Sequence, residues 1–487
     1  MSLFCHRKKM RVMILSPFSL FSLILIFFTS LDLSSSSSTS SQPTFQFDYL
    51  KLPLIHKNQS LPIDPFQTLA SDTRRLNHLY ESLHHRRHRR RSHHKNSSST
   101  AQIPLTSGAS FGTGQYFVSL SIGTPPQPLL LIADTGSDLI WVTCSACRNC
   151  SHREPNSAFL ARHSSTFSPY HCFDSVCELV PQPKRVPCNH TRLHSPCRYE
   201  YSYSDGSLSS GFFARETTTF NTSTGKRVTF KNLAFGCGFE ASGPSITGPS
   251  FNGAQGVIGL GLGAISFPSQ LGRKFANKFS YCLMDYTLSP APTSYLLIGG
   301  GAGSGAAVNT SKMSFTPLIK ENITNTFYYI GIEYVAIEGV KLRISPAAWA
   351  IDELGNGGTV IDSGTTLTFL LQPAYDQVLA AMERRVTLPK SADPNPNFDF
   401  CVNVSGVSRP SLPRMSFKLA GGAVFTPPPQ NYFIDTAPDV KCLAFQPVIS
   451  RSGFNVIGNL MQQGFMFEFD KDRSRLGFSR HGCAIPS

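Results

Sequence analysis

The stretch Leu131-Ile132-Ala133-Asp134-Thr135-Gly136-Ser137-Asp138-Leu139-Ile140-Trp141 has a second copy far downstream, Val360-Ile361-Asp362-Ser363-Gly364-Thr365-Thr366-Leu367. In both copies an apolar run ends near an Asp that is followed by Thr or Ser, then Gly, then Ser or Thr. Asp and Gly favour tight turns, so each copy predicts a carboxylate held where a buried strand ends. Two such turns can face each other, and we therefore expect Asp134 and Asp362 to form one site.

One such string could be an ordinary turn, and the second copy changes that interpretation. With average residue usage, one chance match in a chain of this length has odds of about one in forty, and two matches fall below roughly one in a thousand. The apolar strand before each Asp makes an accidental match less frequent still.

Paired carboxylates have a specific chemistry. Two like charges within hydrogen-bond reach cannot both ionise cheaply, so Asp134 and Asp362 are expected to share one proton. The ionised carboxylate can take a proton from water while the protonated one polarises a carbonyl oxygen, which predicts direct hydrolysis of an amide, best in acid. The two macroscopic pKa values would belong to the pair. Ser137 and Thr365, three residues after each Asp, could hydrogen-bond the outer carboxylate oxygens and orient them.

Length and charge limit the class of protein. The 487 residues allow two or three domains with a sizeable core. Residues 1–110 carry 14 of the 44 Lys and Arg but only 5 of the 30 Asp and Glu. The basic pI of about 9.2 is therefore largely a property of the leader and is weak evidence for nucleic-acid binding by the rest of the chain.

The first 108 residues look like targeting and processing segments. Residues 1–38 contain a basic start and an apolar run from Val12 to Leu31, which predicts a secretory signal, with a retained membrane anchor as the alternative. Residues 39–108 are interpreted as a removable prosegment, with a possible helix from Asp72 to Leu83. The His/Arg run His84–Lys95 within it is typical of solvated, disordered chain. It could also be a cleavage site, or an inhibitory segment whose cations pair with acidic groups.

Cysteine usage agrees with secretion. Of 13 Cys, Cys5 lies in the leader, and an even number remains after signal removal. The spacing of Cys144, Cys147 and Cys150 would also suit zinc, but an oxidising compartment favours disulfides. Asn-x-Ser/Thr sites in polar surroundings predict glycosylated loops at Asn189, Asn221, Asn309, Asn322 and Asn403, whereas Asn149 is less suitable because Cys150 follows it.

Short apolar runs separated by turn residues predict a mostly β body from about residue 112. The halves share landmarks, because each Asp turn is followed later by an apolar pair and Gly, Val257-Ile258-Gly259 and Val456-Ile457-Gly458-Asn459. Few helices are expected, at Phe267–Leu271, Pro346–Ala350 and Gln372–Arg385. The expected strands include Phe117–Gly123, Leu129–Ala133, Arg227–Phe235, Ser294–Ile298, Phe327–Ile337, Gly358–Asp362 and Gly464–Phe469.

From about Gln115 to Cys483 the chain resembles a pepsin-like (family A1) aspartic protease of the plant nepenthesin-like, atypical branch. The resemblance rests on both Asp turns, on Tyr116-Phe117 to Gly123-Thr124-Pro125-Pro126, Phe235-Gly236-Cys237-Gly238, Phe279-Ser280-Tyr281-Cys282, Ile457-Gly458-Asn459 and Arg475-Leu476-Gly477-Phe478, and on the Cys-rich insertion after Trp141. It implies an all-β, bilobal pepsin-like acid protease fold, in which two related β-barrel-like lobes enclose an active-site cleft. The lobes are expected at residues 109–312 and 313–487.

The same resemblance implies roles for further residues. Asp134 and Asp362 would be catalytic, supported by Thr135, Gly136, Ser137, Ser363, Gly364 and Thr365. A β-hairpin flap over the cleft would carry Tyr203, with Tyr201 as second choice, and Trp141 would hydrogen-bond the flap Tyr. Ser204 stands where the family usually has Gly, which could stiffen the flap. The implied disulfides are Cys144–Cys147, Cys150–Cys237, Cys172–Cys197, Cys177–Cys188, Cys282–Cys483 and Cys401–Cys442.

The sequence therefore predicts a secreted aspartic endopeptidase, made as a zymogen, that acts on peptide or protein substrates. We expect no metal or organic cofactor, no nucleic-acid partner, no membrane anchor after signal removal, and a monomer in the extracellular space or cell wall, with vacuole or endoplasmic reticulum as other destinations. Two alternatives remain: a catalytically silent pepsin-like protein that inhibits glycosidases, and a glycosidase. The second would need unlike surroundings for its two carboxyl groups, which the symmetric Gly turns do not provide.

Overall fold

The computed structural model describes a defined part of the chain. Residues 45–487 form one compact unit. The described positions are 49–56, 72, 76, 116–148, 158–181, 188, 195–202, 208–221, 227–242, 254–285, 294–299, 313–320, 326–392, 394–448, 450, 453–480 and 483.

The first half of this unit is built from strands. Its longest pair, β7 and β8, is antiparallel over nearly its whole length. The strands up to residue 299 are β1 (Tyr49–His56), β2 (Tyr116–Ile122), β3 (Gln127–Asp134), β4 (Trp141–Arg148), β5 (Ser168–Pro169), β6 (Arg198–Ser202), β7 (Leu208–Asn221), β8 (Arg227–Ser242), β9 (Gly256–Gly259), β10 (Lys278–Cys282) and β11 (Ser294–Gly299).

The second half repeats this strand-rich pattern. Its strands are β12 (Ser314–Ile319), β13 (Tyr328–Ile330), β14 (Ile332–Ile337), β15 (Val340–Lys341), β16 (Thr359–Ile361), β17 (Thr368–Leu371), β18 (Cys401–Asn403), β19 (Met415–Leu419), β20 (Val424–Phe425), β21 (Phe433–Ala437), β22 (Val440–Leu443), β23 (Phe445–Val448), β24 (Asn455–Ile457), β25 (Met466–Asp470) and β26 (Arg475–Ser479).

Helices are short and few in the described part. They are α3 (Phe267–Leu271), α4 (Gln372–Arg385), α5 (Asn459–Gln462) and the 3-10 turns η3 (Ala161–His163), η4 (Ser175–Leu179), η6 (Gly272–Phe275), η8 (Pro346–Ala348), η9 (Ala420–Gly422) and η10 (Pro429–Asn431).

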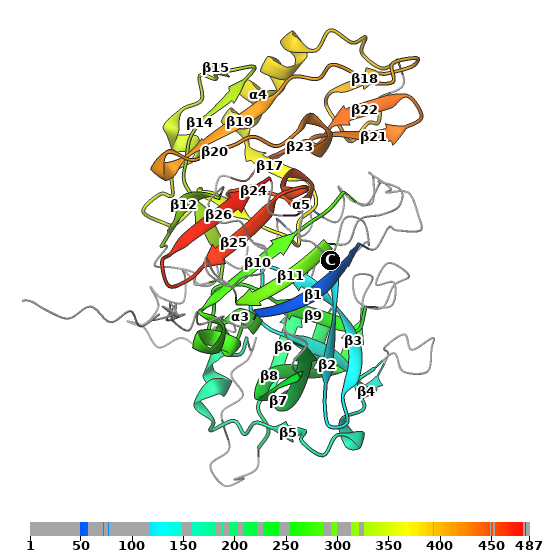
Figure 1. Ribbon diagram of the computed structural model, residues 1–487, viewed down its shortest axis with the longest axis vertical. Helices are drawn as coiled ribbons and strands as arrows, with labels where there is room; N and C mark the ends of the chain where they lie inside the picture. Colours follow the sequence, from blue (N-terminus) through cyan, green and yellow to red (C-terminus); the bar gives the residue numbers. More distant parts are fainter. Residues whose placement is uncertain are drawn as a thin grey trace, which may run out of the picture. The chain divides into compact units, whose positions relative to one another are not determined.

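One large sheet runs through both halves and joins them. Within it β10 of the first half pairs with β25 of the second in antiparallel register, Lys278 opposite Asp470. β25 in turn pairs with β26 and β10 with β11, so Figure 1 shows the red and green strands side by side. Two smaller sheets, β15-β14-β19-β20 and β18-β22-β21, belong to the second half alone. The mostly-β, two-lobed prediction is confirmed.

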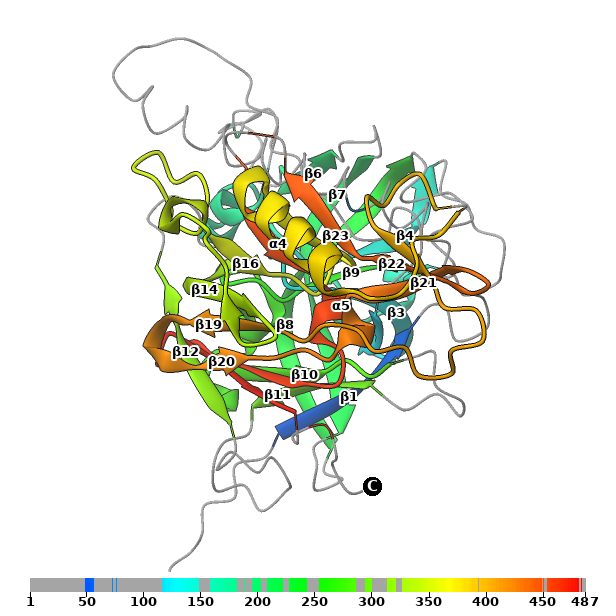
Figure 2. The same cartoon turned by 90° about the horizontal axis from the view of Figure 1, so that it is seen from above.

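The strands follow the apolar pattern of the sequence. Strand β2 alternates near its C-terminal end and is otherwise buried, and β9, β10 and β11 are buried along nearly their whole length. Strands covered on both faces need such continuous apolar runs. The helices α3 and α4 have the predicted bounds, and α4 packs on β17 and β23. Figure 2 shows α4 beside β23.

Three expected elements differ in detail. The run Phe327–Ile337 was expected as one strand, but it divides at Gly331 into β13 and β14, which pair with strands of different sheets. Pro346–Ala350 forms only the short 3-10 turn η8. The strand expected at Gly464–Phe469 is β25, which starts at Met466 rather than Gly464, because Gly464 has a positive φ of 77°.

Strand β1 was not expected from the sequence. It lies in the predicted prosegment, yet it pairs with β11 from Tyr49 to Leu54 and with β2 from Leu54 to His56 (Figure 1). Leu52 and Leu54 are buried in the core. The prosegment therefore contributes a strand to the sheet that joins the two halves.

Two predicted disulfides are present, and the pairing of the others is corrected. Cys282–Cys483 and Cys401–Cys442 are formed as predicted. Cys144 is bonded to Cys237, which contradicts both Cys144–Cys147 and Cys150–Cys237. The reason is strand pairing: β4 runs parallel to β8 with Val142 opposite Cys237, so Cys144 comes within a Cα–Cα distance of 5.4 Å. This bond also removes Cys144 as a zinc ligand, and the side chains of Cys147 and Cys150 lie outside the described part.

The insertion after Trp141 has interlaced rather than nested disulfides. Cys172 is bonded to Cys188 and Cys177 to Cys197, so the predicted pairs Cys172–Cys197 and Cys177–Cys188 are wrong. The turn η4 directs Cys177 inward, where it shares a buried cluster with Cys197. Cys172 and Cys188 are both only half-buried. The fold thus pairs the two interior thiols with each other.

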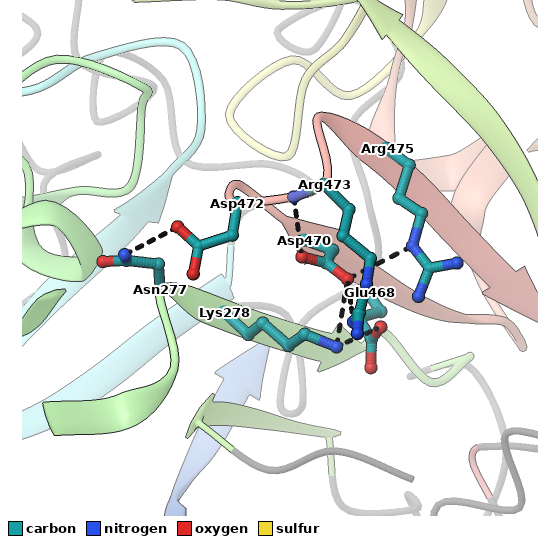
Figure 3. A network of polar contacts seen from close by, with 7 residues as sticks. All are labelled: Asn277, Lys278, Glu468, Asp470, Asp472, Arg473 and Arg475. Carbon is teal, nitrogen blue, oxygen red and sulfur yellow. Dashed lines mark hydrogen bonds and ion pairs between the residues drawn. The ribbon is translucent and has the colours of Figure 1, made fainter. Parts of the chain in front are cut away.

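An ionic cluster lies on the sheet that joins the halves (Figure 3). The Asp470 carboxylate is buried and receives Lys278 Nζ at 3.1 Å, Arg473 Nη1 at 3.1 Å and Arg475 Nε at 3.2 Å. Burial alone would raise the pKa of Asp470, but hydrogen bonds from Lys278 and Arg473 lower it below its ordinary value. The carboxylate therefore stays ionised further into acid than an isolated one.

Among the described residues, none of the helices has the length and apolar character needed to cross a bilayer.

Candidate active site

The first Asp loop follows a fully buried strand. β3 ends at Asp134, whose side chain has 0% of its surface exposed. Its carboxylate accepts a hydrogen bond from Gly136 N at 3.0 Å on Oδ1 and from Ser137 Oγ at 2.6 Å on Oδ2. The turn thus fixes both oxygens of one carboxylate.

The second Asp loop repeats this geometry. Asp362, also fully buried, follows β16 and accepts from Gly364 N at 3.0 Å and from Thr365 Oγ1 at 2.6 Å. The hydrogen bonds expected from Ser137 and Thr365 are therefore both present. The two loops are equivalent in their donors and, within 0.1 Å, in their distances.

The loops are interlocked across the two halves. Ser363 N donates to Thr135 Oγ1 at 2.8 Å, and Thr135 N donates to Ser363 Oγ at 3.1 Å. Thr135 Oγ1 also lies 3.5 Å from Asp362 Oδ1, and Ser363 Oγ donates to Ala133 O at 3.1 Å. These reciprocal bonds hold the two Asp turns face to face, as the paired motif predicts.

A glycine segment backs each loop at close range. β3 runs parallel to β9 with Asp134 opposite Gly259, and β16 runs parallel to β24 with Ile361 opposite Ile457. A Cβ on Gly259 would lie 2.4 Å from the Asp138 carbonyl carbon, and one on Gly458 would lie 2.0 Å from Leu367 O. Only Gly permits these approaches. The apolar-apolar-Gly repeats therefore act as supports for the Asp loops.

The predicted flap is described only at its base. Strands β6 and β7 form a hairpin with Ser202 opposite Leu208. Tyr203, Ser204 and the Asp205-Gly206 tip lie outside the described residues. Trp141 is buried in a cluster with Tyr199 and Tyr201. The roles of Tyr203 and of the Trp141 hydrogen bond stay predictions.

Sequence reasoning missed three residues at the back of the site. Gln462 and Asn459, from α5, donate to the backbone carbonyls of Asp362 at 3.2 Å and Ser363 at 2.9 Å. Asp72, from the predicted prosegment, accepts from Thr366 N at 3.0 and 2.9 Å and from Leu367 N. The Asn459 signal was available in the Ile457-Gly458-Asn459 motif, whereas a single Asp or Gln carries no pattern of its own.

This arrangement can perform acid–base chemistry on one substrate. Two oriented carboxylates in a buried site can exchange protons with a water and a carbonyl. Within the described part of the chain, no group of three or more His, Cys, Asp or Glu side chains gathers as metal ligands would.

A two-lobed β fold with two interlocked Asp-Thr/Ser-Gly loops, one from each half, defines the pepsin-like class of aspartic proteases. Comparison with known families and proteins agrees. Family models described as "Xylanase inhibitor N-terminal" and "Xylanase inhibitor C-terminal" match residues 116–300 and 327–480.

Among curated relatives, the chain is 36% identical over 382 residues to Aspartyl protease family protein 2 of Arabidopsis thaliana, covering 78% of this chain and 73% of that protein. It is 35% identical over 374 residues to Aspartic proteinase nepenthesin-1 of Nepenthes gracilis, covering 76% and 79%. The chain therefore belongs to the plant pepsin-like aspartic protease family. A crystal structure titled edgp has the same fold, with a TM-score of 0.63 at 21% identity over 91% of this chain and 99% of that one.

Proposed function

We propose that this protein is a secreted aspartic endopeptidase that hydrolyses peptide bonds with water activated between Asp134 and Asp362. The observation that carries the proposal is the interlocking of the two Asp loops through Thr135 and Ser363. Such a scaffold keeps two like charges close together and oriented, which is what a proton-sharing pair requires.

The proposed mechanism needs only these two side chains. The ionised carboxylate removes a proton from water, whose oxygen attacks the peptide carbonyl carbon. The protonated carboxylate gives its proton to the carbonyl oxygen, so a neutral tetrahedral intermediate forms. As the C–N bond breaks, the amide nitrogen takes the proton of the protonated carboxyl group, and a hydroxyl of the intermediate gives its proton to the other carboxylate. The products are an amine and a carboxylic acid, and the pair again holds one proton. Ser137 and Thr365 keep the outer oxygens fixed throughout, and the pair works best in acid.

Three observations support synthesis as a zymogen. Both Asp134 and Asp362 are fully buried in the chain that still carries the predicted prosegment. Asp72 occupies the backbone N–H groups of Thr366 and Leu367, directly after the second Asp loop. Strand β1 ties the same prosegment into the sheet. Removal of the prosegment, expected between Arg91 and Gly112, would release these contacts.

The test is cleavage of a denatured protein at acid pH by the acid-treated full-length chain, with and without pepstatin. We expect pepstatin-sensitive cleavage, and a loss of about 10³-fold or more for Asp134→Ala and for Asp362→Ala. Asp435→Ala is the matched control, because Asp435 is a largely exposed carboxylate whose ion-pair partner in the described part of the chain is Lys441. Retained cleavage in either active-site variant would overturn the mechanism.

A catalytically silent binding protein is the second candidate, because both matching family models carry the description of xylanase inhibitors. On this proposal the chain would bind a glycosidase without cleaving it. A chain whose prosegment has been removed, which does not cleave denatured protein at any pH and which inhibits a xylanase, would favour it. Retention of both complete Asp loops favours the endopeptidase.

Secretion, glycosylation and destination belong to the same proposal. The signal segment, and the sites Asn189, Asn309 and Asn322, lie outside the described residues, and the side chain of Asn221 does as well. Asn403 lies at the end of β18 and is half-buried, with its Oδ1 accepting from Ser405 N at 2.7 Å. We propose a monomer in the extracellular space or cell wall, with no cofactor.

A further inference from the structure

The backbone N–H of Asp362 donates to Ile457 O at 3.2 Å, whereas its backbone carbonyl accepts from a side chain. Gln462, the last residue of α5, is fully buried, and its Nε2 donates to Asp362 O at 3.2 Å and to Ile457 O at 2.9 Å. One amide group therefore joins the second Asp loop to the strand that backs it.

The orientation of this amide is fixed from the other half of the molecule. The Tyr281 hydroxyl, on β10, donates to Gln462 Oε1. Because Oε1 is occupied by a donor, Nε2 faces the two carbonyls. Burial, and then the charge of Asp362, raise the pKa of Tyr281 well above its ordinary value, so the hydroxyl keeps its proton at any working pH.

In the first Asp loop, the corresponding carbonyl is held by a backbone N–H. Asp134 O accepts from Leu260 N at 2.8 Å, a backbone bond that substitution of Leu260 leaves in place. The corresponding tyrosine, Tyr328 of the second half, reaches Leu260 O directly at 2.8 Å. The hydrogen bond to the Asp362 carbonyl thus depends on two side-chain groups, whereas the one to the Asp134 carbonyl comes from a backbone N–H.

We propose that Tyr281 and Gln462 form a positioning pair that sets the angle of the Asp362 carboxylate toward Asp134. This inference rests on the proposed function, because it concerns the geometry of the catalytic pair. Neither residue touches the carboxylate or a substrate. A carboxylate that turns out of line would change how the proton is shared between the two Asp residues, and small misplacements of a catalytic group can cost about 10²-fold in rate.

The test compares acid-activated Gln462→Leu, Tyr281→Phe and the double variant on one peptide substrate. For Gln462→Leu we expect kcat to fall about 10- to 100-fold with KM changed less than about 3-fold, and the acidic limb of the kcat/KM profile to move. For Tyr281→Phe we expect a fall of about 3- to 10-fold with the same movement. The double variant should resemble Gln462→Leu, because Tyr281 acts only through Gln462.

The matched control is Tyr432→Phe. Tyr432 is also a fully buried tyrosine with partners, donating to Pro413 O at 2.7 Å and accepting from Met415 N at 3.0 Å. It should lose thermal stability without any change in kcat or pH profile. That separates positioning from a general effect of losing a buried hydroxyl.

The outcomes separate this inference from the proposed function. If Asp362→Asn is inactive while Tyr281→Phe and Gln462→Leu keep the wild-type kcat and pH profile, the positioning role is wrong and the endopeptidase stands. If Asp362→Asn still cleaves, the proposed function fails first. If Gln462→Leu does not fold, Tyr281→Phe decides, because it deletes a single oxygen.

Discussion

The two Asp loops are alike where they face the site and unlike behind it. Each carboxylate accepts one backbone N–H at 3.0 Å and one hydroxyl at 2.6 Å. The backbone carbonyl of Asp134 accepts a hydrogen bond from Leu260 N, whereas the backbone carbonyl of Asp362 accepts from the side-chain amide of Gln462. The chemistry of the pair is thus duplicated, while the hydrogen bond to the backbone carbonyl of each Asp is not.

A second difference concerns which other parts of the chain form hydrogen bonds with each Asp loop. The first loop is tied to the second half through Asp138, which accepts from Thr326 Oγ1 at 2.6 Å and from Gly263 N at 2.8 Å. The second loop is contacted by the prosegment through Asp72. The comparison teaches that the first loop is linked to the second half of the molecule, whereas the second loop is contacted by the predicted prosegment, which the proposed function would remove.

The largest loss of stability is expected from substitutions of Gly259 and Gly458, the backing glycines, because the two loops resemble each other at these positions. Gly259→Ala and Gly458→Ala should each destabilise the protein by more than about 3 kcal/mol, because the added Cβ would meet backbone atoms at 2.4 and 2.0 Å. The measurement is the yield of folded protein and its Tm. Gly406→Ala is the control, because its φ of 72° is strained but nothing lies within 4 Å. A folded, stable Gly458→Ala protein would contradict the close approach.

Removing the Asp138 side chain should break the hydrogen bond that links the first Asp loop to Thr326 of the second half. We expect Asp138→Ala to cost about 3 kcal/mol, because Thr326 and Gly263 lose a half-buried charged acceptor. Burial already lowers the pKa of Lys471 to about 8 against the opposing charge of Asp138, so this pKa should fall further in the variant. Urea denaturation measures the first effect and NMR titration of the lysine the second. Thr326→Val, which removes one hydrogen bond, should cost only about 1 kcal/mol.

The sequence predicted the local motifs of the site better than the long-range contacts that hold these motifs in place. Both Asp turns, their orienting hydroxyls and the backing glycines follow from short motifs whose geometry is local. Tyr281, Gln462 and Asp72 could not be found this way, because each acts through one contact with a residue far along the chain. The crossed disulfides of Cys172 and Cys177 were missed for a related reason: spacing does not reveal that η4 turns Cys177 inward.

Substitution in the ionic cluster around Asp470 tests whether the stability of the protein in acid comes from the two Asp loops or from the sheet that joins the halves. Asp470→Asn should cost about 2 kcal/mol at neutral pH, where its three cationic partners face a full charge. Because the folded-state pKa of Asp470 lies below the ordinary value of 3.8, this contribution is complete above about pH 4 and is lost as pH falls through the lowered pKa. Thermal unfolding of both proteins from pH 2 to 7 should show the gap closing only at the acid end. A gap that is constant with pH would place the stabilisation elsewhere.

The smallest effect is expected at the contact between Asp72 of the predicted prosegment and the second Asp loop. Asp72→Ala should speed acid conversion of the precursor by about 10-fold, because the prosegment loses a charged acceptor for Thr366 N and Leu367 N. The rate is read from the appearance of the shortened chain on a gel. Asp435→Ala, an exposed carboxylate, should convert at the wild-type rate. Equal rates for all three proteins would show that Asp72 does not restrain the loop.

Strand β1 has a consequence for how this protein is produced. A recombinant chain started at residue 109 lacks the partner of β11 along Ser294–Gly299 and of the start of β2. Those strands then present unpaired N–H and C=O groups, which are a template for pairing with another copy. A recombinant chain that keeps Tyr49–His56 should avoid this aggregation route, since β1 then pairs with β11 and β2 while the rest of the chain folds.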